Sequence, residues 1–284
     1  MPPAGTLYVV ATPIGNLEDI TLRALKVLKS VQLVAAEDTR RTGILLRHFD
    51  IKVPIISVHE HNERGRVEKI AARLAKGESV ALVTDAGTPG VSDPGATLVG
   101  AIRRAGFRIE PIPGASAVAT AISAAGINSE GFTFLGFPPI RGKDRRMWFE
   151  ALVATIANRA AVFFEAPHKV RKTLEELSVS VDYPIFVARE LTKLHEELTW
   201  GSPTELVAKF DNPHGEFTVI IPPRVHAQNV VQGHPDTEVA TVVGHITETH
   251  HTKSLREAAR LAGERLGMSA RDVYAALERT KLGR

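Results

Sequence analysis

A glycine- and proline-rich stretch, Val80–Gly95, has the residue types and spacing best suited to ligand binding. It begins with an apolar run, Val80–Val83, that is typical of a buried strand in a parallel sheet. Thr84 and Asp85 end this run, and three glycines and two prolines follow. Glycine lets a backbone approach a ligand closely, and proline stiffens a loop before binding. Because open α/β sheets bind ligands at the carboxyl ends of their strands, we favour a ligand-binding loop over an ordinary strand-to-helix turn.

Acidic and basic side chains gather in a second stretch, Arg189–Glu197. Its Glu190, Lys193 and Glu197 would share one face if the stretch were helical. A lysine beside carboxylates suits proton transfer to or from a bound substrate. A cluster of surface ion pairs is the alternative, and the spacing alone does not separate the two.

Alternating strands and helices in the first part of the chain would position these residues. Short apolar, β-branched runs predict strands at residues 6–11, 31–36, 53–58, 80–83 and 108–112. The alternation predicts an α/β domain with a parallel sheet that helices cover on both faces. Three strands lead into loops that would meet at one sheet edge: Pro13–Gly15, Gly87–Pro94 and Pro113–Gly114.

The pattern changes after a small-residue helix that we predict at Ala117–Ala125. Shorter strands with hairpin-like spacing follow, and they predict a second domain of α+β type. A polar segment with five of the eleven histidines comes next, and we predict no metal site there because no carboxylate or cysteine pattern accompanies His250 and His251. The predicted organisation is an N-terminal α/β domain at residues 1–122, a second domain at 123–224, a linker at 225–251 and a helical tail at 252–284.

The tail, residues 252–284, carries two helix-start signals. Ser254 and Glu257 form a capping-box pattern, and Ser269 follows a glycine turn at Gly267. Two short helices around such a turn, with several arginines, are compatible with a helix-turn-helix. A plain helical hairpin fits the same pattern equally well.

Composition limits the class of protein. The 284 residues are 44% hydrophobic, and no apolar run approaches the ~20 residues that a membrane helix needs, so we expect a soluble protein without a membrane partner. No secretory signal is evident, and a cytoplasmic location is expected. The absence of cysteine excludes disulfides and thiolate nucleophiles, while a net charge of +3 permits nucleic-acid binding. Dinucleotide, P-loop and hydrolase-elbow motifs are absent, which argues against those enzyme classes.

Nine short motifs carry a family resemblance: Ala11–Asn16, Glu37–Arg40, His61–Glu63, Thr84–Gly95, Pro113–Ala117, Phe134–Phe137, Phe164–His168, Arg189–Glu197 and Gly215–Phe217. In this order they closely resemble the ribosomal RNA small subunit methyltransferase I family, of the tetrapyrrole-methylase (class III methyltransferase) fold. The resemblance implies an α/β enzyme of two domains with a helix-turn-helix-like tail. It also implies a homodimer that uses S-adenosylmethionine to methylate the 2′-oxygen of a cytidine ribose in the decoding centre of 16S rRNA.

Loop position and the resemblance together assign the residues of the cofactor site. For the aromatic members, above all Phe134, core packing is the alternative. The predicted cofactor-binding residues are Pro13, Gly15, Asp85, Gly87, Thr88, Pro89, Ser92, Ser116, Phe134, Glu165, Ala188 and Phe217.

The resemblance also gives the charged stretch a role. A ribose hydroxyl is a weak nucleophile and a sulfonium is a good leaving group, so alignment of the reacting atoms should make the largest contribution to the rate. Proton removal should add a secondary rate gain of ~10²–10⁴-fold. We expect Glu190, Lys193 and Glu197 to be the catalytic residues. Lys193 would orient or acidify the hydroxyl and a carboxylate would accept its proton, with the choice of carboxylate left open.

Basic clusters are expected to contact the phosphates of 16S rRNA or of the small ribosomal subunit, although solvated surface charge is the alternative reading of each. The predicted RNA-binding residues are Arg40, Arg41, Arg145, Arg146, Lys169 and Arg171. Two rival functions remain. Methylation of a tetrapyrrole or another small molecule would not require the basic clusters, and a non-catalytic RNA-binding assembly factor would not require intact cofactor loops.

Overall fold

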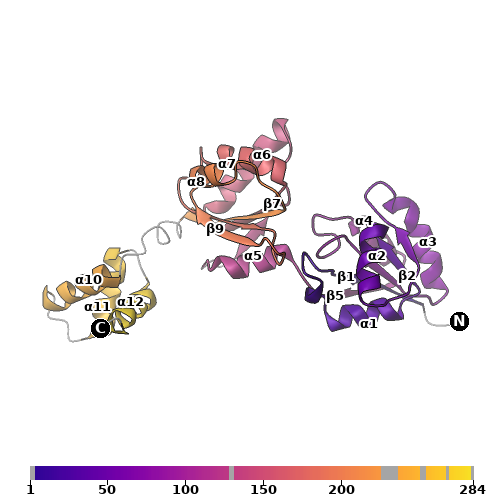
Figure 1. The fold of residues 1–284 in the computed structure, drawn as a ribbon, viewed down its shortest axis with the longest axis horizontal. Helices are drawn as coiled ribbons and strands as arrows, with labels where there is room; N and C mark the ends of the chain where they lie inside the picture. Colours follow the sequence, from indigo (N-terminus) through magenta and orange to yellow (C-terminus); the bar gives the residue numbers. More distant parts are fainter. Residues whose placement is uncertain (1–3, 128–130, 225–235, 250–253, 267–268, 283–284) are drawn as a thin grey trace.

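The structure is a computed structural model that describes residues 4–127, 131–224, 236–249, 254–266 and 269–282. Figure 1 shows two layered domains and a group of C-terminal helices. None of the helices in these ranges is long and apolar enough to cross a membrane. The same residues contain no group of three or more histidines and carboxylates arranged to hold a metal ion.

The first domain is built on a five-stranded sheet in the order β3-β2-β4-β1-β5. All neighbouring strands pair in parallel, as the alternation of strands and helices predicts. Its elements are β1 (Thr6–Val10), η1 (Leu17–Asp19), α1 (Leu22–Ser30), β2 (Leu33–Ala36), α2 (Thr39–His48), β3 (Ile55–Ser57), α3 (Glu63–Ala75), β4 (Val80–Val83), α4 (Ala96–Arg104) and β5 (Arg108–Ile112).

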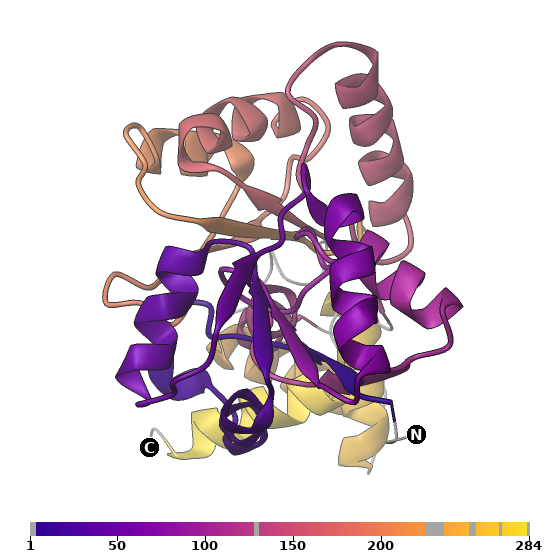
Figure 2. The ribbon, with the colours of Figure 1, turned by 90° about the vertical axis from the view of Figure 1, so that its right-hand side faces the viewer.

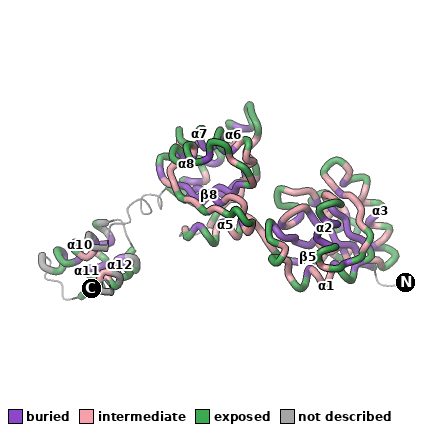
Figure 3. The backbone as a smooth tube through the Cα atoms, in the orientation of Figure 1, coloured by how far each residue is buried: buried purple, intermediate pink, exposed green. Residues whose placement is uncertain are grey.

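Two separate cores cover the two faces of this sheet, because successive strand residues point to opposite sides. Val34 packs with residues of α1 and α2 in one core, whereas Leu33 packs with residues of α3 and α4 in the other. Helices therefore flank the sheet on both sides (Figure 2). The central strands β2 and β4 are fully buried, and exposed residues lie on the helices and at the edge of the sheet (Figure 3). Since the strands are parallel, the loops after β1, β4 and β5 all leave the same edge.

The second domain contains a mixed sheet in the order β6-β7-β10-β8-β9. Only β6 and β7 pair in parallel, and the remaining neighbours are antiparallel. Its elements are α5 (Ala117–Ala125), β6 (Phe132–Phe134), α6 (Gly142–Ile156), β7 (Ala160–Glu165), α7 (Pro167–Leu177), β8 (Ile185–Arg189), β9 (Glu197–Gly201), α8 (Pro203–Lys209) and β10 (Phe217–Ile221).

Helix α5 belongs to the second domain, so the boundary lies before it and not at residue 122. Val118, Ala121 and Ala125 pack in one core with Ile220 of β10. The opposite face of the mixed sheet packs against α6, α7 and α8. The small residues of α5 let the helix lie close to the second sheet. Small residues would allow close packing against either sheet, so the composition of α5 alone does not show which domain it joins.

Three helices form the C-terminal unit: α10 (Asp236–Thr249), α11 (Leu255–Leu266) and α12 (Ala270–Leu282). The prediction of a linker through residue 251 is therefore wrong from residue 236 onward, and 225–235 lie outside the described residues. Val239, Val243 and Ile246 of α10 pack with alanines of α11 and α12 in a core of their own. This apolar stripe recurs at helical spacing, but the polar and histidine-rich composition around it concealed the pattern.

Candidate functional site

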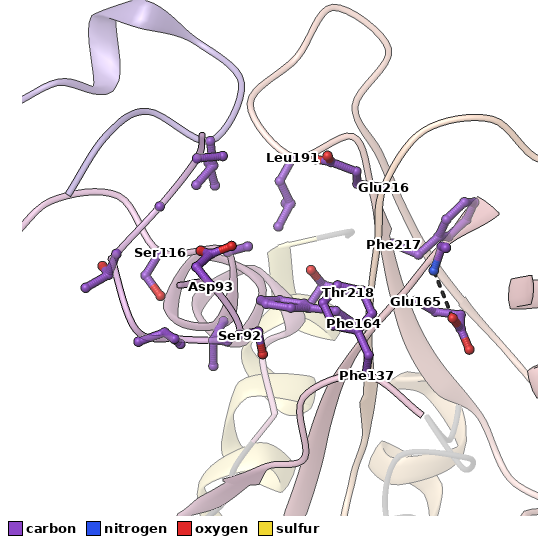
Figure 4. A pocket seen from close by; sticks show the side chains of 18 of the residues that line it. Ser92, Asp93, Ser116, Phe137, Phe164, Glu165, Leu191, Glu216, Phe217 and Thr218 are labelled. Carbon is purple, nitrogen blue, oxygen red and sulfur yellow. Dashed lines mark hydrogen bonds between the residues drawn. The ribbon is translucent and has the colours of Figure 1, made fainter. Parts of the chain in front are cut away.

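A cavity of about 400 Å³ lies between the two domains. One wall comes from first-domain residues, Ile14, residues 86–88 and 91–93, and Ser116, and the start of α5, Ala117 and Val118, lies beside it. The facing wall comes from the second domain, where Phe137, residues 164–167, Leu191 and residues 216–218 line it. Figure 4 shows the labelled side chains of both walls converging on this space. The loops that leave one edge of the first sheet therefore form a shared chamber with the second sheet.

Backbone hydrogen bonds fix the loops on the first-domain side. The Thr12 N–H donates to the Gly87 carbonyl at 2.9 Å, and the Gly87 N–H donates back at 3.0 Å. The Thr12 hydroxyl also donates to the Thr84 carbonyl at 3.1 Å. Gly87 has a φ of +76°, which residues with a side chain rarely adopt. These contacts anchor the loop after β4 to the loop after β1.

Aromatic rings form much of the second-domain wall. Phe164 contacts Phe134 edge-on, with 4.8 Å between ring centroids, and Phe137 at 5.5 Å. Phe164 and Phe137 line the cavity, whereas Phe134 supports Phe164 from behind. Flat apolar surfaces of this kind suit a planar heterocycle.

Three carboxylates line the cavity, from Asp93, Glu165 and Glu216, and no lysine, arginine or histidine is among its described lining residues. Burial and, to a lesser extent, the carboxylates of Glu37, Asp85 and Glu216 together raise the pKa of Asp93 to about 7. An acidic, cation-free chamber attracts a positively charged ligand and repels phosphate. The cavity therefore fits a cationic ligand with an apolar ring.

The stretch after β8 is a tight turn and not a helix, so the helical condition under which Glu190, Lys193 and Glu197 would share one face is not met. Glu190 and Thr192 have φ values of +53° and +64°. The Lys193 ammonium donates to Glu190 at 2.7 Å and to Glu216 at 3.1 Å. Although burial opposes it, the bond from Lys193 lowers the pKa of Glu190. This ion-pair network presents Leu191 and Glu216 to the cavity.

Residues 6–207 match the family model of the tetrapyrrole (corrin/porphyrin) methylases. A relative from Synechocystis is 44% identical over 221 residues, 76% of this chain and 78% of its own length. A relative from Thermotoga maritima is 45% identical over 220 residues, 76% of this chain and 98% of its own length. One from Escherichia coli O157:H7 is 40% identical over 277 residues, 95% and 93% of the two chains. Each relative is named ribosomal RNA small subunit methyltransferase I.

The chain belongs to the ribosomal RNA small subunit methyltransferase I family. Members are methyltransferases of the tetrapyrrole-methylase type that use S-adenosylmethionine as methyl donor. Solved structures support the fold. A uroporphyrin-III C-methyltransferase from Thermus thermophilus gives a TM-score of 0.55 at 21% identity, over 76% of this chain and 94% of that one. A diphthine synthase gives a TM-score of 0.60 at 18% identity, over 78% of this chain and 90% of that one.

The family's cofactor fits the chemistry of this cavity, because S-adenosylmethionine carries a sulfonium cation and an adenine ring. Six of the twelve predicted cofactor residues line the chamber: Gly87, Thr88, Ser92, Ser116, Glu165 and Phe217. Glu165 is buried, and it accepts hydrogen bonds from the Ala166 N–H at 2.9 Å and the Thr173 hydroxyl at 2.6 Å. It serves as a fixed acidic element of the wall.

The other six predicted cofactor residues lie outside the lining. Pro13 and Pro89 belong to the surrounding loops, and Ala188 is buried in the core beneath the chamber. Asp85 accepts a hydrogen bond from the Asp38 N–H at 3.0 Å and lies 3.6 Å from Arg41. Phe134 lies behind Phe164, as the core-packing alternative predicts. Gly15 lies instead where the two domains touch.

The lining residues that the sequence prediction missed lie beside residues that it named. Asp93 follows Ser92, and Glu216 precedes Phe217 in a motif that was already noted. Phe137 ends the motif that begins at Phe134. The motifs therefore carried the signal, but only the fold shows which member of each faces the chamber.

Glu197 is separated from the rest of its predicted catalytic group. It begins the edge strand β9, and it pairs with Lys209 at 2.6 Å and Arg189 at 3.4 Å. Lys209 lowers the pKa of the Glu197 carboxyl. Glu197 does not line the cavity.

Arg145 is a buried structural residue, which corrects its predicted role in RNA contact. Its guanidinium donates to Glu176 at 2.7 Å, to the Pro139 carbonyl at 2.8 Å and to Thr173 at 3.0 Å. Spacing along α6 could not show which of two adjacent arginines points inward. The neighbouring Arg146 is exposed.

Most of the other predicted RNA contacts have acidic partners. Arg40 pairs with Asp38 at 2.7 Å, and Arg171 pairs with Glu175 and Asp211. A groove of about 540 Å³ between α6 and α7 has Arg141, Arg146 and Lys172 among its lining residues. Arg141 and Arg146 have no ion pair among the described residues and are exposed, so this groove is the more accessible cationic surface.

Gly15 is expected to set the distance between the two walls of the cavity. A Cβ there would lie 2.5 Å from Lys193 Cγ and 2.7 Å from the Leu191 carbonyl oxygen. Replacing Gly15 by Val should force the Leu191 turn away and weaken S-adenosylmethionine binding by at least ~10-fold, about 1.4 kcal/mol. Isothermal titration calorimetry measures the change.

The matched control is Gly65→Ala, because nothing lies within 4 Å of a Cβ at that helical position. Gly65→Ala should bind the cofactor like the wild type. Equal affinity in a folded Gly15→Val variant would show that the contact between the domains does not shape the site.

Proposed function

We propose that the chain transfers the methyl group of S-adenosylmethionine to the 2′-oxygen of a cytidine ribose in the decoding centre of 16S rRNA. The observation that carries the proposal is the 40–45% identity to relatives named ribosomal RNA small subunit methyltransferase I. The tetrapyrrole methyltransferase structure is only 21% identical, which supports the fold alone. The expected location of this activity is the cytoplasm, where ribosomal RNA is found.

The chain's own residues supply binding and orientation in this proposal. When bound, S-adenosylmethionine supplies a methyl group activated by its sulfonium. The residues proposed to hold it are those that both the motifs and the cavity select: Gly87, Thr88, Ser92, Ser116, Glu165 and Phe217. Rigid loops and aromatic walls would fix the cofactor with little loss of conformational freedom on binding.

The proposed reaction has a direct test. Small ribosomal subunits lacking the modification are incubated with the protein and S-adenosylmethionine, and the 16S rRNA is digested and mapped by mass spectrometry. One methyl group on a cytidine ribose is the expected product. Methyl transfer to a base, or to no rRNA nucleotide at all, would contradict the proposal.

Lys193 is proposed to orient the ribose hydroxyl. An ammonium group has three N–H donors, and Glu190 and Glu216 accept two of them. The third is left for a substrate oxygen at the edge of the cavity. The catalytic roles predicted for Glu190 and Glu197 stay predictions, with Glu190 acting through Lys193.

Lys193→Ala is expected to lower the single-turnover rate of methyl transfer by at least ~10-fold, about 1.4 kcal/mol of barrier. Cofactor affinity should stay within a few-fold, because Lys193 does not line the cavity. The matched control is Lys209→Ala, which removes the cation paired with Glu197 outside the cavity. Equal rates in both variants would assign Lys193 a structural role only.

The groove between α6 and α7 is proposed to bind the RNA backbone. Two arginines that line the groove, Arg141 and Arg146, are exposed. Arg145 is buried, and its guanidinium carbon lies 5.2 Å from the centroid of the Phe149 ring. A concave surface with exposed cations suits phosphate contacts, which position an RNA without reading its sequence.

Replacing Arg141 and Arg146 together by Ala should weaken rRNA binding and reduce its salt dependence. Each lost phosphate contact lowers the log–log slope by about 0.7–0.9, so a reduction between about one and two is expected. Filter binding at several salt concentrations measures it. The control is Arg103→Ala with Arg104→Ala, at the end of α4 farthest from the cavity. An unchanged slope would show that the groove does not contact RNA.

A homodimer is also proposed, as the family resemblance implies. Supporting it, Leu194, Leu198 and Trp200 expose apolar side chains on the edge strand β9 and the turn before it. Exposed apolar side chains grouped at a sheet edge are typical of surfaces that a partner covers.

A further inference from the structure

We propose that Asp93 accepts the proton of the ribose 2′-hydroxyl during methyl transfer. This inference rests on the proposed function, because it assigns the proton acceptor of that reaction. Asp93 lies within the motif Thr84–Gly95, but it is not among the cofactor-binding or catalytic residues that the sequence predicts. What distinguishes it from the other carboxylates that face the cavity is its lack of a partner.

Two of the three lining carboxylates are already engaged. Glu165 accepts hydrogen bonds from the Thr173 hydroxyl and the Ala166 N–H. Glu216 pairs with Lys193, and its side chain is 71% exposed. Asp93 has no hydrogen bond and no ion pair within the part of the chain that the structure describes, and it is half-buried. It is therefore the lining carboxylate whose oxygens are free to take a proton.

The loop after β4 fixes where this carboxylate lies. The Gly90 N–H donates to the Pro94 carbonyl at 3.2 Å, which closes the loop around Asp93. Ser92 has a φ of +62°, and a Cβ at Gly95 would lie 3.0 Å from Leu82. Because the loop is anchored on both sides of Asp93, the carboxylate stays at the cavity wall. Figure 4 shows it across the chamber from Leu191 and Phe164.

The charges around Asp93 suit a base that works near neutral pH. Glu37 follows β2, Asp85 follows β4 and Glu216 precedes β10, and each adds negative charge on top of the effect of burial. Two of these carboxylates have cationic partners, since Arg41 lies 3.6 Å from Asp85 and Lys193 pairs with Glu216, and no cation contributes to the pKa of Asp93. These surroundings raise the pKa of Asp93 to about 7, so the carboxylate is a stronger base than an exposed aspartate.

The proposed step balances without a further reactant. The ribose O2′ forms a bond to the methyl carbon while the carbon–sulfur bond breaks, and the electron pair of that bond stays on sulfur. The O2′–H bond breaks as its proton passes to an Asp93 oxygen. Asp93 leaves the step protonated and returns the proton to solvent after the product departs.

Asp93→Asn tests the step, because the amide keeps the shape of the side chain but cannot accept the proton. Its single-turnover rate on small subunits should fall by at least ~100-fold. S-adenosylmethionine affinity, measured by calorimetry, should fall by a much smaller factor than the rate, because two of the three lining carboxylates remain. The wild-type rate should rise with pH to a plateau above about 7, and the variant should lack this inflection. Asp182→Asn, an exposed aspartate, is the isosteric control.

A second measurement does not depend on activity. A carboxyl with a raised pKa binds its proton more tightly in the folded than in the unfolded protein. The free energy of unfolding of the wild type should therefore decrease as the pH rises from about 4 to about 7. Asp93→Asn removes that loss. Its melting temperature should exceed that of the wild type at pH 8, and the difference should vanish near pH 4.

The outcomes are distinguishable. If the wild type methylates rRNA and Asp93→Asn matches its rate, the proposed function stands and Asp93 is not the base. If the variant loses cofactor affinity and rate by the same factor, Asp93 is a cofactor ligand and the inference is again wrong. If the wild type methylates no rRNA although it binds S-adenosylmethionine, the proposed function fails and the inference fails with it.

Discussion

The pair of backbone hydrogen bonds between Thr12 and Gly87 is the constraint on which the site depends. It joins the loops of two neighbouring parallel strands, so each loop satisfies the polar groups of the other. Buried backbone N–H and C=O groups without hydrogen-bond partners cost free energy. Without this bridge, the two loops would have to move so that water could hydrogen-bond these groups. With the bridge in place, the loop of residues 84–95 is tied to the loop after β1, and this connection positions residues 86–88 and 91–93 at the cavity.

The contact between the two domains includes a turn with backbone strain, which an ion-pair network offsets. Glu190 and Thr192 adopt left-handed backbone conformations, which cost on the order of 1 kcal/mol each for residues other than glycine. The Lys193 network stabilises this turn, and the Thr192 hydroxyl accepts a hydrogen bond from the Asn16 N–H at 3.1 Å. The charged residues for which the sequence predicts a catalytic role therefore also shape the contact between the two domains.

The sequence was sufficient for the first domain and insufficient for the turn after β8. Alternating strands and helices, with loops at the carboxyl ends, correctly predicted the parallel sheet and the edge that carries the ligand loops. Helical periodicity was misleading at Glu190–Glu197, because ion pairs with Glu216, which is distant in sequence, hold a turn there. Likewise, only tertiary packing distinguishes buried Arg145 from exposed Arg146, and only the loop path distinguishes Asp93 from Asp85.

The order of strands in the second sheet has a consequence for synthesis on the ribosome. Strand β10 comes last in that sheet's sequence yet lies in its middle, between β7 and β8. The first sheet is complete once β5 has emerged, so this domain can fold while the rest is being translated. The second sheet must wait for β10, with β8 and β9 paired to each other but detached from β7. A nascent chain that stalls before residue 217 would contain a folded first domain but an incomplete second wall of the cavity. The unpaired edges of its apolar strands would be exposed to chaperones.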